Sequence, residues 1–256
     1  MLNIIGLNNI NSIFYLNSII QSLISCKSFV KWVLQNKEVF INEKNQIGIL
    51  FYNIIKKIQN DVDLNNENYI LSKKLNFEDQ NCAHEALLLI IDKLNIENIF
   101  KIKYNTYKHC NECNNTTRVE AIDLVTYDYY FSDKDDFTES INNEVEPIDD
   151  CECEFCKKKT SQKLIKKVIE SNDVFVVMFK QYNSKKNYKY DNILLLNNMI
   201  YKLKAKICHI GNLNGGHYWV TRYIGSKILK INDENITELD SDIVDEYTYM
   251  LFYQKI

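Results

Sequence analysis

Apolar residues recur at helical spacing in the N-terminal part of the chain and form short continuous runs in its C-terminal part, which predicts helices followed by strands. The first helix follows a polar loop of Gly, Asn and Ser. Ser12 is its candidate N-cap, because a hydroxyl there can accept from a free backbone N–H. The buried face of this helix is formed by Leu16, Ile19, Ile20 and Leu23. Residues 29–58 continue as helix, and residues 60–68 are polar and turn-like.

A second strongly apolar helix, extending to residue 94, is predicted to follow Asp79 or Asn81, either of which could cap it. Residues 118–131 are rich in Val, Ile, Leu, Thr and Tyr and predict a strand. Residues 132–150 contain Pro147 and many Asp and Glu residues, which predicts an acidic, solvated loop. Further strands are predicted at residues 174–182, 207–210, 217–220, 228–231 and 246–254.

The composition is typical of a soluble globular protein. The 256 residues, 46% hydrophobic and 25% charged, can bury a core as one domain or two closely joined lobes. A net charge of −3 favours neither nucleic acid nor an anionic membrane as a partner. The sequence shows no long uncharged apolar run and no signal peptide, so we expect a cytoplasmic or nuclear protein. Its eight cysteines should therefore stay reduced, as thiols or metal ligands.

Two Cys-x-x-Cys turns form a candidate zinc site. A tight turn places two thiolates at adjacent corners of a tetrahedron, which is the geometry that zinc prefers. His109 and Cys151 lie beside the two turns and could replace a ligand, although their spacing fits less well. We expect one structural zinc ion, with idle thiols as the alternative. Its ligands would be Cys110, Cys113, Cys153 and Cys156.

The polar loop and the first helix resemble the cysteine box of the ubiquitin-specific proteases, Gly-Leu-x-Asn-Leu-Gly-Asn-Thr-Cys-Tyr-Leu-Asn-Ser, followed by two residues and Gln. The matching residues are Gly6, Leu7, Asn9, Tyr15, Leu16, Asn17, Ser18 and Gln21. Cysteine proteases place their nucleophile at a helix N-terminus, where the dipole favours the thiolate. Here the nucleophile position holds Phe14. The resemblance makes Asn9 the side-chain donor to the oxyanion.

Two further boxes of the family follow in the right order. The sequence before the second apolar helix resembles Gln-Gln-Asp-Ala-His-Glu, which in the family lines the channel for the ubiquitin C-terminal tail. The Asp that binds an arginine there is replaced by Cys82, which cannot form that charge-assisted pair. Gly-Gly-His-Tyr resembles the histidine box, so His217 aligns with the catalytic base, and Asn232, followed by Asp233, aligns with the residue that orients it. The resemblance assigns the tail channel to Gln80, Cys82, His84, Glu85, Gly215, Gly216 and Tyr218.

The matches run from Gly6 to Gln254 and imply one α+β domain, residues 1–256, with the papain-like fold of this family. The resemblance implies a helical thumb at about residues 1–100, β fingers with the zinc site at about 101–173, and a β palm with His217 at about 174–256. One palm strand departs from the family, because Gln181 and Tyr182 stand where Arg-Phe is usual.

The missing thiol decides which function we expect. Hydrolysis needs a thiolate, a base, a group that orients the base, and oxyanion donors, and phenylalanine has no nucleophilic atom. Cys26 would lie about 18 Å along the helix, Ser12 would need the loop rebuilt, and Cys82 belongs to the tail channel. We therefore expect an inactive family member that binds ubiquitin or a ubiquitinated protein. The alternatives are an active deubiquitinating thiol hydrolase that cleaves isopeptide bonds, and a scaffold that no longer binds ubiquitin.

Overall fold

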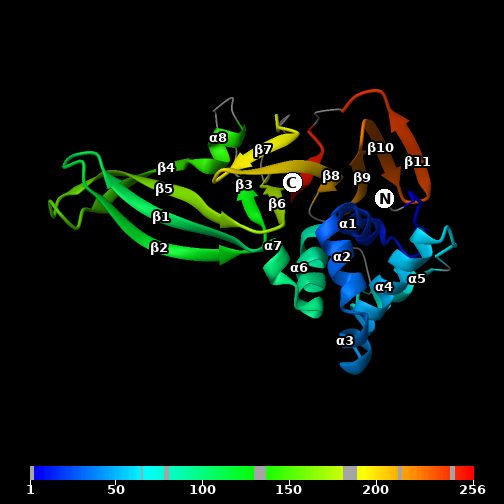
Figure 1. Ribbon diagram of the computed structural model, residues 1–256. Coiled ribbons are helices and arrows are strands. Elements are labelled where there is room, and N and C mark those ends of the chain that lie inside the picture. Colours follow the sequence, from blue (N-terminus) through cyan, green and yellow to red (C-terminus); the bar gives the residue numbers. More distant parts are fainter. Residues whose placement is uncertain are drawn as a thin grey trace.

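A layer of helices covers one face of a large sheet, and a smaller sheet projects from this body (Figure 1). The computed structural model describes residues 3–64, 66–77, 81–129, 137–180, 189–212, 215–242 and 246–256. Among these residues no helix has both the length and the apolar character needed to cross a bilayer. The helices are α1 (Phe14–Ser25), α2 (Lys27–Gln35), α3 (Lys37–Asn42), α4 (Gln46–Gln59), α5 (Glu67–Lys74), α6 (Ala83–Leu94), α7 (Glu97–Phe100) and α8 (Phe137–Asn142).

The large sheet has the strand order β11-β10-β9-β8-β12-β6-β3, with β7 paired to β8. Its pairs are antiparallel except for β3 and β6, which run parallel. Its strands are β3 (Tyr127–Tyr129), β6 (Val174–Phe179), β7 (Ile193–Leu196), β8 (Met199–Asn212), β9 (Gly215–Ile224), β10 (Lys227–Asn232), β11 (Asn235–Leu239) and β12 (Thr248–Lys255).

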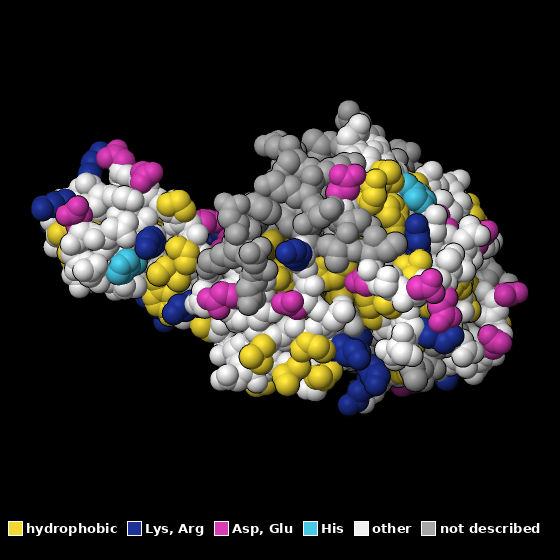
Figure 2. All heavy atoms as spheres, turned by 90° about the horizontal axis from the view of Figure 1, so that it is seen from above, with side chains coloured by type: hydrophobic (Ala, Val, Ile, Leu, Met, Phe, Trp, Pro, Cys, Tyr) yellow, Lys and Arg dark blue, Asp and Glu magenta, His cyan; other side chains and the backbone are white. Residues whose placement is uncertain are grey.

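The projecting sheet is antiparallel and has the order β2-β1-β5-β4. Its strands are β1 (Ile102–Cys110), β2 (Thr116–Leu124), β4 (Glu144–Glu152) and β5 (Lys159–Ser171). The same projection is visible from above, where acidic and basic side chains are interspersed over much of the surface (Figure 2).

Strand β6 is buried on both faces, which explains its uninterrupted apolar sequence. Val174, Val176 and Met178 join the core under the helices. The alternate residues join a second core, which also contains α8 and β3 residues. A strand between two cores has no solvent face and needs no polar position. The α+β class, α1, α6 and this strand are therefore confirmed.

The acidic loop predicted at residues 132–150 is wrong for the residues that the structure describes. Phe137 and Ile141 are buried in the second core as part of α8. Strand β4 then pairs with the lysine-rich β5, where Lys166 bridges Glu144 at 3.2 Å and Glu146 at 3.1 Å. The acidic residues have cationic partners across the ladder, so their charge does not indicate a solvated loop.

Two predicted caps are also wrong, and one predicted turn ends earlier than expected. Ser12 has a left-handed backbone (φ 59°), and Ile13 is the N-cap of α1 without a side-chain hydrogen bond. Cys82, instead of Asn81, precedes α6 as its N-cap, and the other candidate, Asp79, lies outside the described residues. Helix α5 begins within the segment predicted as turn, because Asn68 and Leu71 are buried.

Candidate functional site

Phe14 is the first residue of α1, and its ring packs against the imidazole of His217 on β9. The ring centroids lie 4.8 Å apart at an interplanar angle of 63°. The Tyr218 ring lies 6.2 Å from that of Phe14 on the same side. Only 7% of Phe14 is exposed. The structure thus places the expected nucleophile position directly against the histidine of Gly-Gly-His-Tyr, with an aromatic ring in place of a thiol.

His217 is held by Asn232, the last residue of the neighbouring strand β10. The distance between His217 Nε2 and Asn232 Oδ1 is 2.6 Å. An amide oxygen only accepts hydrogen bonds, so this contact favours the tautomer with its proton on Nε2. The other ring nitrogen, Nδ1, is then unprotonated and can act as a base.

Asp233 ties the N-terminal loop and α1 to the end of β10. Its carboxylate accepts from Asn17 Nδ2 at 2.8 Å, and the side chain of Asn9 lies close to it. Its backbone carbonyl accepts from the N–H of Leu7 at 2.9 Å. Burial raises the pKa of this carboxyl group, and the bond from Asn17 opposes that shift. Asn17 also accepts from Asn68 Nδ2 at 2.8 Å, which brings α5 into the same network.

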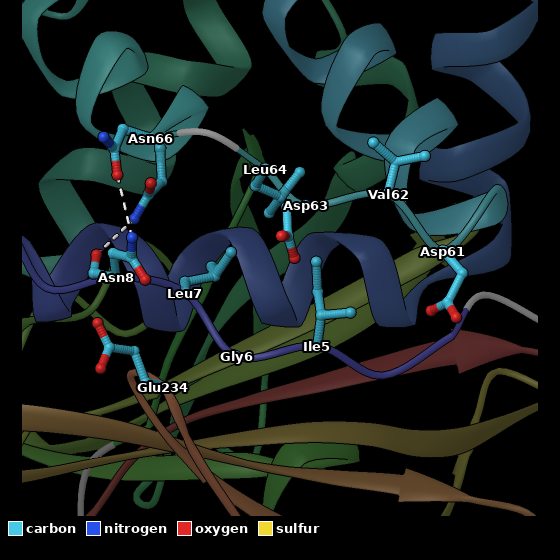
Figure 3. A pocket seen from close by; sticks show the side chains of 11 residues that line it. Ile5, Gly6, Leu7, Asn8, Asp61, Val62, Asp63, Leu64, Asn66 and Glu234 are labelled. Atoms are coloured by element: carbon cyan, nitrogen blue, oxygen red, sulfur yellow. Dashed lines mark hydrogen bonds between the residues drawn. The ribbon is translucent and has the colours of Figure 1, made fainter.

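A polar cavity of about 550 Å³ lies beside this network, between the N-terminal loop, the α4–α5 connection and the turn after β10 (Figure 3). Asp61, Asp63 and Glu234 line it, whereas Phe14, His217 and Asn232 do not. Asn8 bonds to Asn66 across its edge at 3.0 Å. Gly6 passes so close to this turn that a Cβ there would lie 2.4 Å from the Glu234 carbonyl oxygen, which explains the glycine.

Cys82 lies between the helical layer and the large sheet. Its sulfur is 2.9 Å from the hydroxyl of Tyr249 on β12. The Tyr218 hydroxyl lies close to the same thiol and to the backbone N–H of Ala83. Burial raises the pKa of Tyr218 far above its usual range, so its hydroxyl stays protonated. The Cys82 thiol and two tyrosine hydroxyls thus meet at the junction of helices and sheet.

The paired glycines before His217 allow the β8–β9 hairpin to close tightly. A Cβ on Gly216 would lie 2.2 Å from His209 Nε2 and 2.5 Å from the Ile210 carbonyl oxygen. His209 in turn stacks on Tyr218, with centroids 4.3 Å apart. Gly215 pairs with Asn212 across the hairpin.

Two further tail-channel candidates, His84 and Glu85, have other surroundings than Cys82. His84 Nε2 lies 2.9 Å from the hydroxyl of Thr126, between β2 and β3. Burial and then Lys180 lower the pKa of His84, which favours the neutral imidazole. Glu85 is exposed in the first turn of α6. Gln80, Gln181 and Tyr182 lie outside the described residues.

The four cysteines of the two Cys-x-x-Cys turns meet at the end of the projecting sheet and could hold zinc. Their sulfurs all lie within 4.8 Å of one another. Cys113 and Cys153 are 3.7 Å apart, close to the roughly 3.8 Å between sulfurs that bind one tetrahedral zinc ion. The Thr160 hydroxyl and nearby backbone N–H groups lower the pKa of Cys110 to about 6, which favours the thiolate. The ligand set is Cys110, Cys113, Cys153 and Cys156.

His109 and Cys151, the alternative ligands, are not part of this group among the described residues. His109 Nδ1 instead lies 2.9 Å from the Thr116 hydroxyl.

Sequence reasoning missed a buried polar cluster on the large sheet. Lys206 Nζ lies 3.0 Å from Asp242 Oδ1, and the hydroxyls of Tyr190 and Tyr223 donate to Asp242 Oδ2 at 2.8 and 2.7 Å. A lysine between the apolar residues Ala205 and Ile207 was a usable signal. Asn68, in contrast, lay in a segment with no pattern that pointed to the site.

Comparisons with known proteins agree with this architecture. No curated protein matches the sequence. The SAGA DUB module of Ubp8, Sgf11, Sus1 and Sgf73 bound to monoubiquitin matches with a TM-score of 0.83 at 19% identity, over 99% of this chain and 69% of that chain. A yeast SAGA DUB module with a mutant Sgf73 matches with a TM-score of 0.79 at 18% identity, over 99% and 68%.

A third structure, the same kind of module bound to ubiquitin aldehyde, matches with a TM-score of 0.76 at 18% identity, over 99% and 70% of the two chains. These similarities confirm the papain-like α+β fold of the ubiquitin-specific protease type. Residues 5–253 match the family described as ubiquitin carboxyl-terminal hydrolase. The chain therefore belongs to the ubiquitin carboxyl-terminal hydrolase family.

Proposed function

We propose that this protein is a deubiquitinase-like domain that has lost hydrolysis and binds ubiquitin, or a ubiquitinated protein, without cleaving it. One observation carries the proposal: the ring of Phe14 occupies the first turn of α1 against His217, where the attacking sulfur would be. Phenylalanine offers neither a nucleophile nor a proton to transfer.

The proposal assigns the other catalytic roles to residues beside Phe14. We assign the base position to His217 and its orientation to Asn232, which lie 2.6 Å apart. Asn9 is the candidate oxyanion donor, and its contact with Asp233 holds it beside the turn after β10. A protein that is selected for binding a partner, and not for hydrolysing a substrate, would keep this arrangement of His217 and Asn232.

The active alternative lacks a usable substitute nucleophile. Cys26 is fully buried, and burial raises the pKa of its thiol to about 12. The Cys82 thiol is hydrogen-bonded to Tyr249 and contacts Tyr218 instead of a histidine. Ser12 is exposed in the loop, two positions before Phe14.

Ubiquitin binding is proposed from the family and from two structural neighbours, which hold monoubiquitin and ubiquitin aldehyde. In this proposal the helices form a thumb, the projecting sheet forms fingers, and the large sheet forms the palm of one domain. Zinc would join the β1–β2 and β4–β5 turns at the end of the fingers. Since all eight cysteines are free, a reducing compartment, cytoplasm or nucleus, fits this assignment. The tail channel would comprise Gln80, Cys82, His84, Glu85, Gly215, Gly216 and Tyr218.

A second candidate is a scaffold that no longer binds ubiquitin, and the contacts of Cys82 favour it. Tyr249 and Tyr218 join Cys82 across the junction of helices and sheet, and these side chains offer no carboxylate to an arginine.

Calorimetric titration of ubiquitin onto the purified protein tests the proposal, together with an electrophilic ubiquitin probe that labels active thiols. Saturable binding without labelling is the expected result. Labelling of the native protein, or cleavage of a ubiquitin conjugate, would establish the active alternative. If ubiquitin does not bind even at millimolar concentration, the protein is the scaffold that no longer binds ubiquitin.

A further inference from the structure

One face of the large sheet packs against the helices, but at the β7–β8 hairpin the residues on this face are exposed. Leu195 and Ile200 are direct cross-strand partners, and Ile193 lies two residues from Leu195 on the same face. They are exposed by 49% (Ile193), 51% (Leu195) and 46% (Ile200). The alternate residues Leu194, Leu196, Tyr201 and Leu203 point the other way and are buried in the second core.

The outward direction of this apolar face is fixed by the hairpin, because a strand buried on one side must present its alternate residues to the other. Polar residues usually occupy such positions on a solvated antiparallel sheet. Aliphatic residues at successive outward positions of two paired strands therefore indicate a surface that a partner covers.

Three lysines border this apolar face. Lys202 is the cross-strand partner of Ile193, and on its other side it pairs with Gln254 of β12. Gln254 Oε1 accepts from the backbone N–H of Lys27 at the start of α2, so Lys27 and Lys202 flank one glutamine. The register between β8 and β12 shifts at Lys204. Phe252 pairs with Ala205 and Tyr253 pairs with Leu203, so Lys204 has no partner on β12. The extra residue of such a bulge is left unpaired in the ladder, and Lys204 is close enough to Lys27 and Lys202 for their charges to act on it.

The positive charge of these lysines is not neutralised within the described part of the chain. None of the three forms an ion pair there, in contrast to Lys57, Lys166 and Lys180. Burial, Lys202 and Lys27 lower the pKa of Lys204, in line with cations crowded together. Lys27 also stands in the first turn of α2, where the positive end of the helix dipole disfavours a cation.

We infer that the surface formed by Ile193, Leu195, Ile200, Lys27, Lys202 and Lys204 docks an acidic amphipathic segment of a partner protein. Its apolar residues would cover the hairpin, and its carboxylates would pair with the lysines. A second copy of the chain is disfavoured, since an isologous dimer would bring together two identical surfaces that both carry this positive charge. Neither Phe14 nor His217 contributes, so this surface can serve either of the functions proposed above.

Two synthetic helical peptides with the same leucine face test this inference, one with a glutamate polar face and one with a lysine polar face. Fluorescence anisotropy should show binding of the glutamate peptide alone, weakening as salt rises. Leu195→Ser and the pair Lys202→Glu with Lys204→Glu should each weaken binding by roughly ten-fold or more. Matched changes at other exposed positions, Val119→Ser and Lys74→Glu, should not.

Equal binding of both peptides, or binding of neither, would refute the inference. So would equal weakening by the matched changes. Sedimentation of the native protein as a dimer that Leu195→Ser dissociates would assign the surface to a second copy instead. Circular dichroism and thermal unfolding of each variant confirm that the fold is retained.

Discussion

The ring of Phe14 lies 4.8 Å from the imidazole of His217, edge to face, at the N-terminus of α1. In the proposed function, this contact replaces the pair of thiol and imidazole that hydrolysis needs. Aromatic pairs in this arrangement stabilise a fold by about 0.5–1.5 kcal/mol beyond their burial. Phe14 thus connects α1 to β9 through packing, in the position where a catalytic pair would connect them through a proton.

Phe14→Cys should create a thiol that reacts with an electrophile at the C-terminus of ubiquitin, whereas the native protein should not react. The helix dipole and His217 would favour the thiolate. The change also removes a buried ring, so we expect a loss of about 2–4 kcal/mol in unfolding free energy, read from urea denaturation. Mass spectrometry of the probe adduct measures the reaction.

The control for this reaction is Phe14→Cys combined with His217→Ala. It retains the thiol but lacks the base, and should not form the adduct. Equal labelling of the two proteins would mean that His217 does not act on residue 14, which would contradict the assigned site.

Cys82→Asp should strengthen the reactivity of Phe14→Cys if the tail channel is otherwise intact. A carboxylate there could pair with an arginine of the ubiquitin tail, which a thiol cannot do. The rate of adduct formation at low probe concentration is the measurement, since it reports binding as well as chemistry. If the double variant neither reacts nor binds ubiquitin, the scaffold function is the correct one.

Metal analysis of the purified protein should find about one equivalent of zinc. Cys153→Ser should lose it, because this thiol sits 3.7 Å from Cys113 within the group of four. The matched control is Cys151→Ser, which changes a thiol two positions away and outside the group, and should keep the metal. Less than half an equivalent in the native protein, or equal loss in both variants, would argue against the site.

The sequence predicted best those helices and strands whose own pattern of apolar residues determines their structure. The apolar spacing in α1 and α6 and the unbroken run in β6 report burial directly, and so these elements were predictable. The acidic segment that forms β4 was not, because its partner lysines come from β5. Local charge does not reveal a cross-strand partner.

The residues of the site divide in the same way, into those that a local motif identifies and those whose partners are distant in sequence. Phe14, His217 and Asn232 could be named from short motifs, since each motif has a fixed spacing. The partner of Cys82 could not, because Tyr249 lies 167 positions along the chain. The cap rule failed at Ser12 because two successive left-handed residues, Asn11 and Ser12, lead into the helix.

Asp242→Ala should destabilise the fold far more than Asp240→Ala. Lys206 is only 2% exposed, and Asp242 is its carboxylate partner. Removing that partner takes one carboxylate from the surroundings of a buried ammonium group, at a cost of about 3–5 kcal/mol. Asp240 is exposed, so its replacement should change little. Thermal and urea denaturation compare the two, and equal effects would show that Lys206 is stabilised by other groups.

Asp233→Asn should change how stability depends on pH. Burial raises the pKa of Asp233 above its ordinary value of 3.8, so the folded state holds this proton more tightly than the unfolded state. The stabilisation from the protonated carboxyl is fully present below pH 3.8 and is lost as pH rises through the raised pKa. An asparagine can still accept from Asn17 and does not ionise.

The stability of Asp233→Asn relative to the native protein should therefore rise with pH above 3.8 and then level off once the native carboxyl is ionised. Urea denaturation across this range measures the difference, and Asp240→Asn serves as the control for a change in net charge alone. A difference that stays constant would mean that Asp233 has the same proton affinity in both states. A difference that falls would mean that the bonds from Asn9 and Asn17 outweigh burial, so that the network stabilises the charged carboxylate.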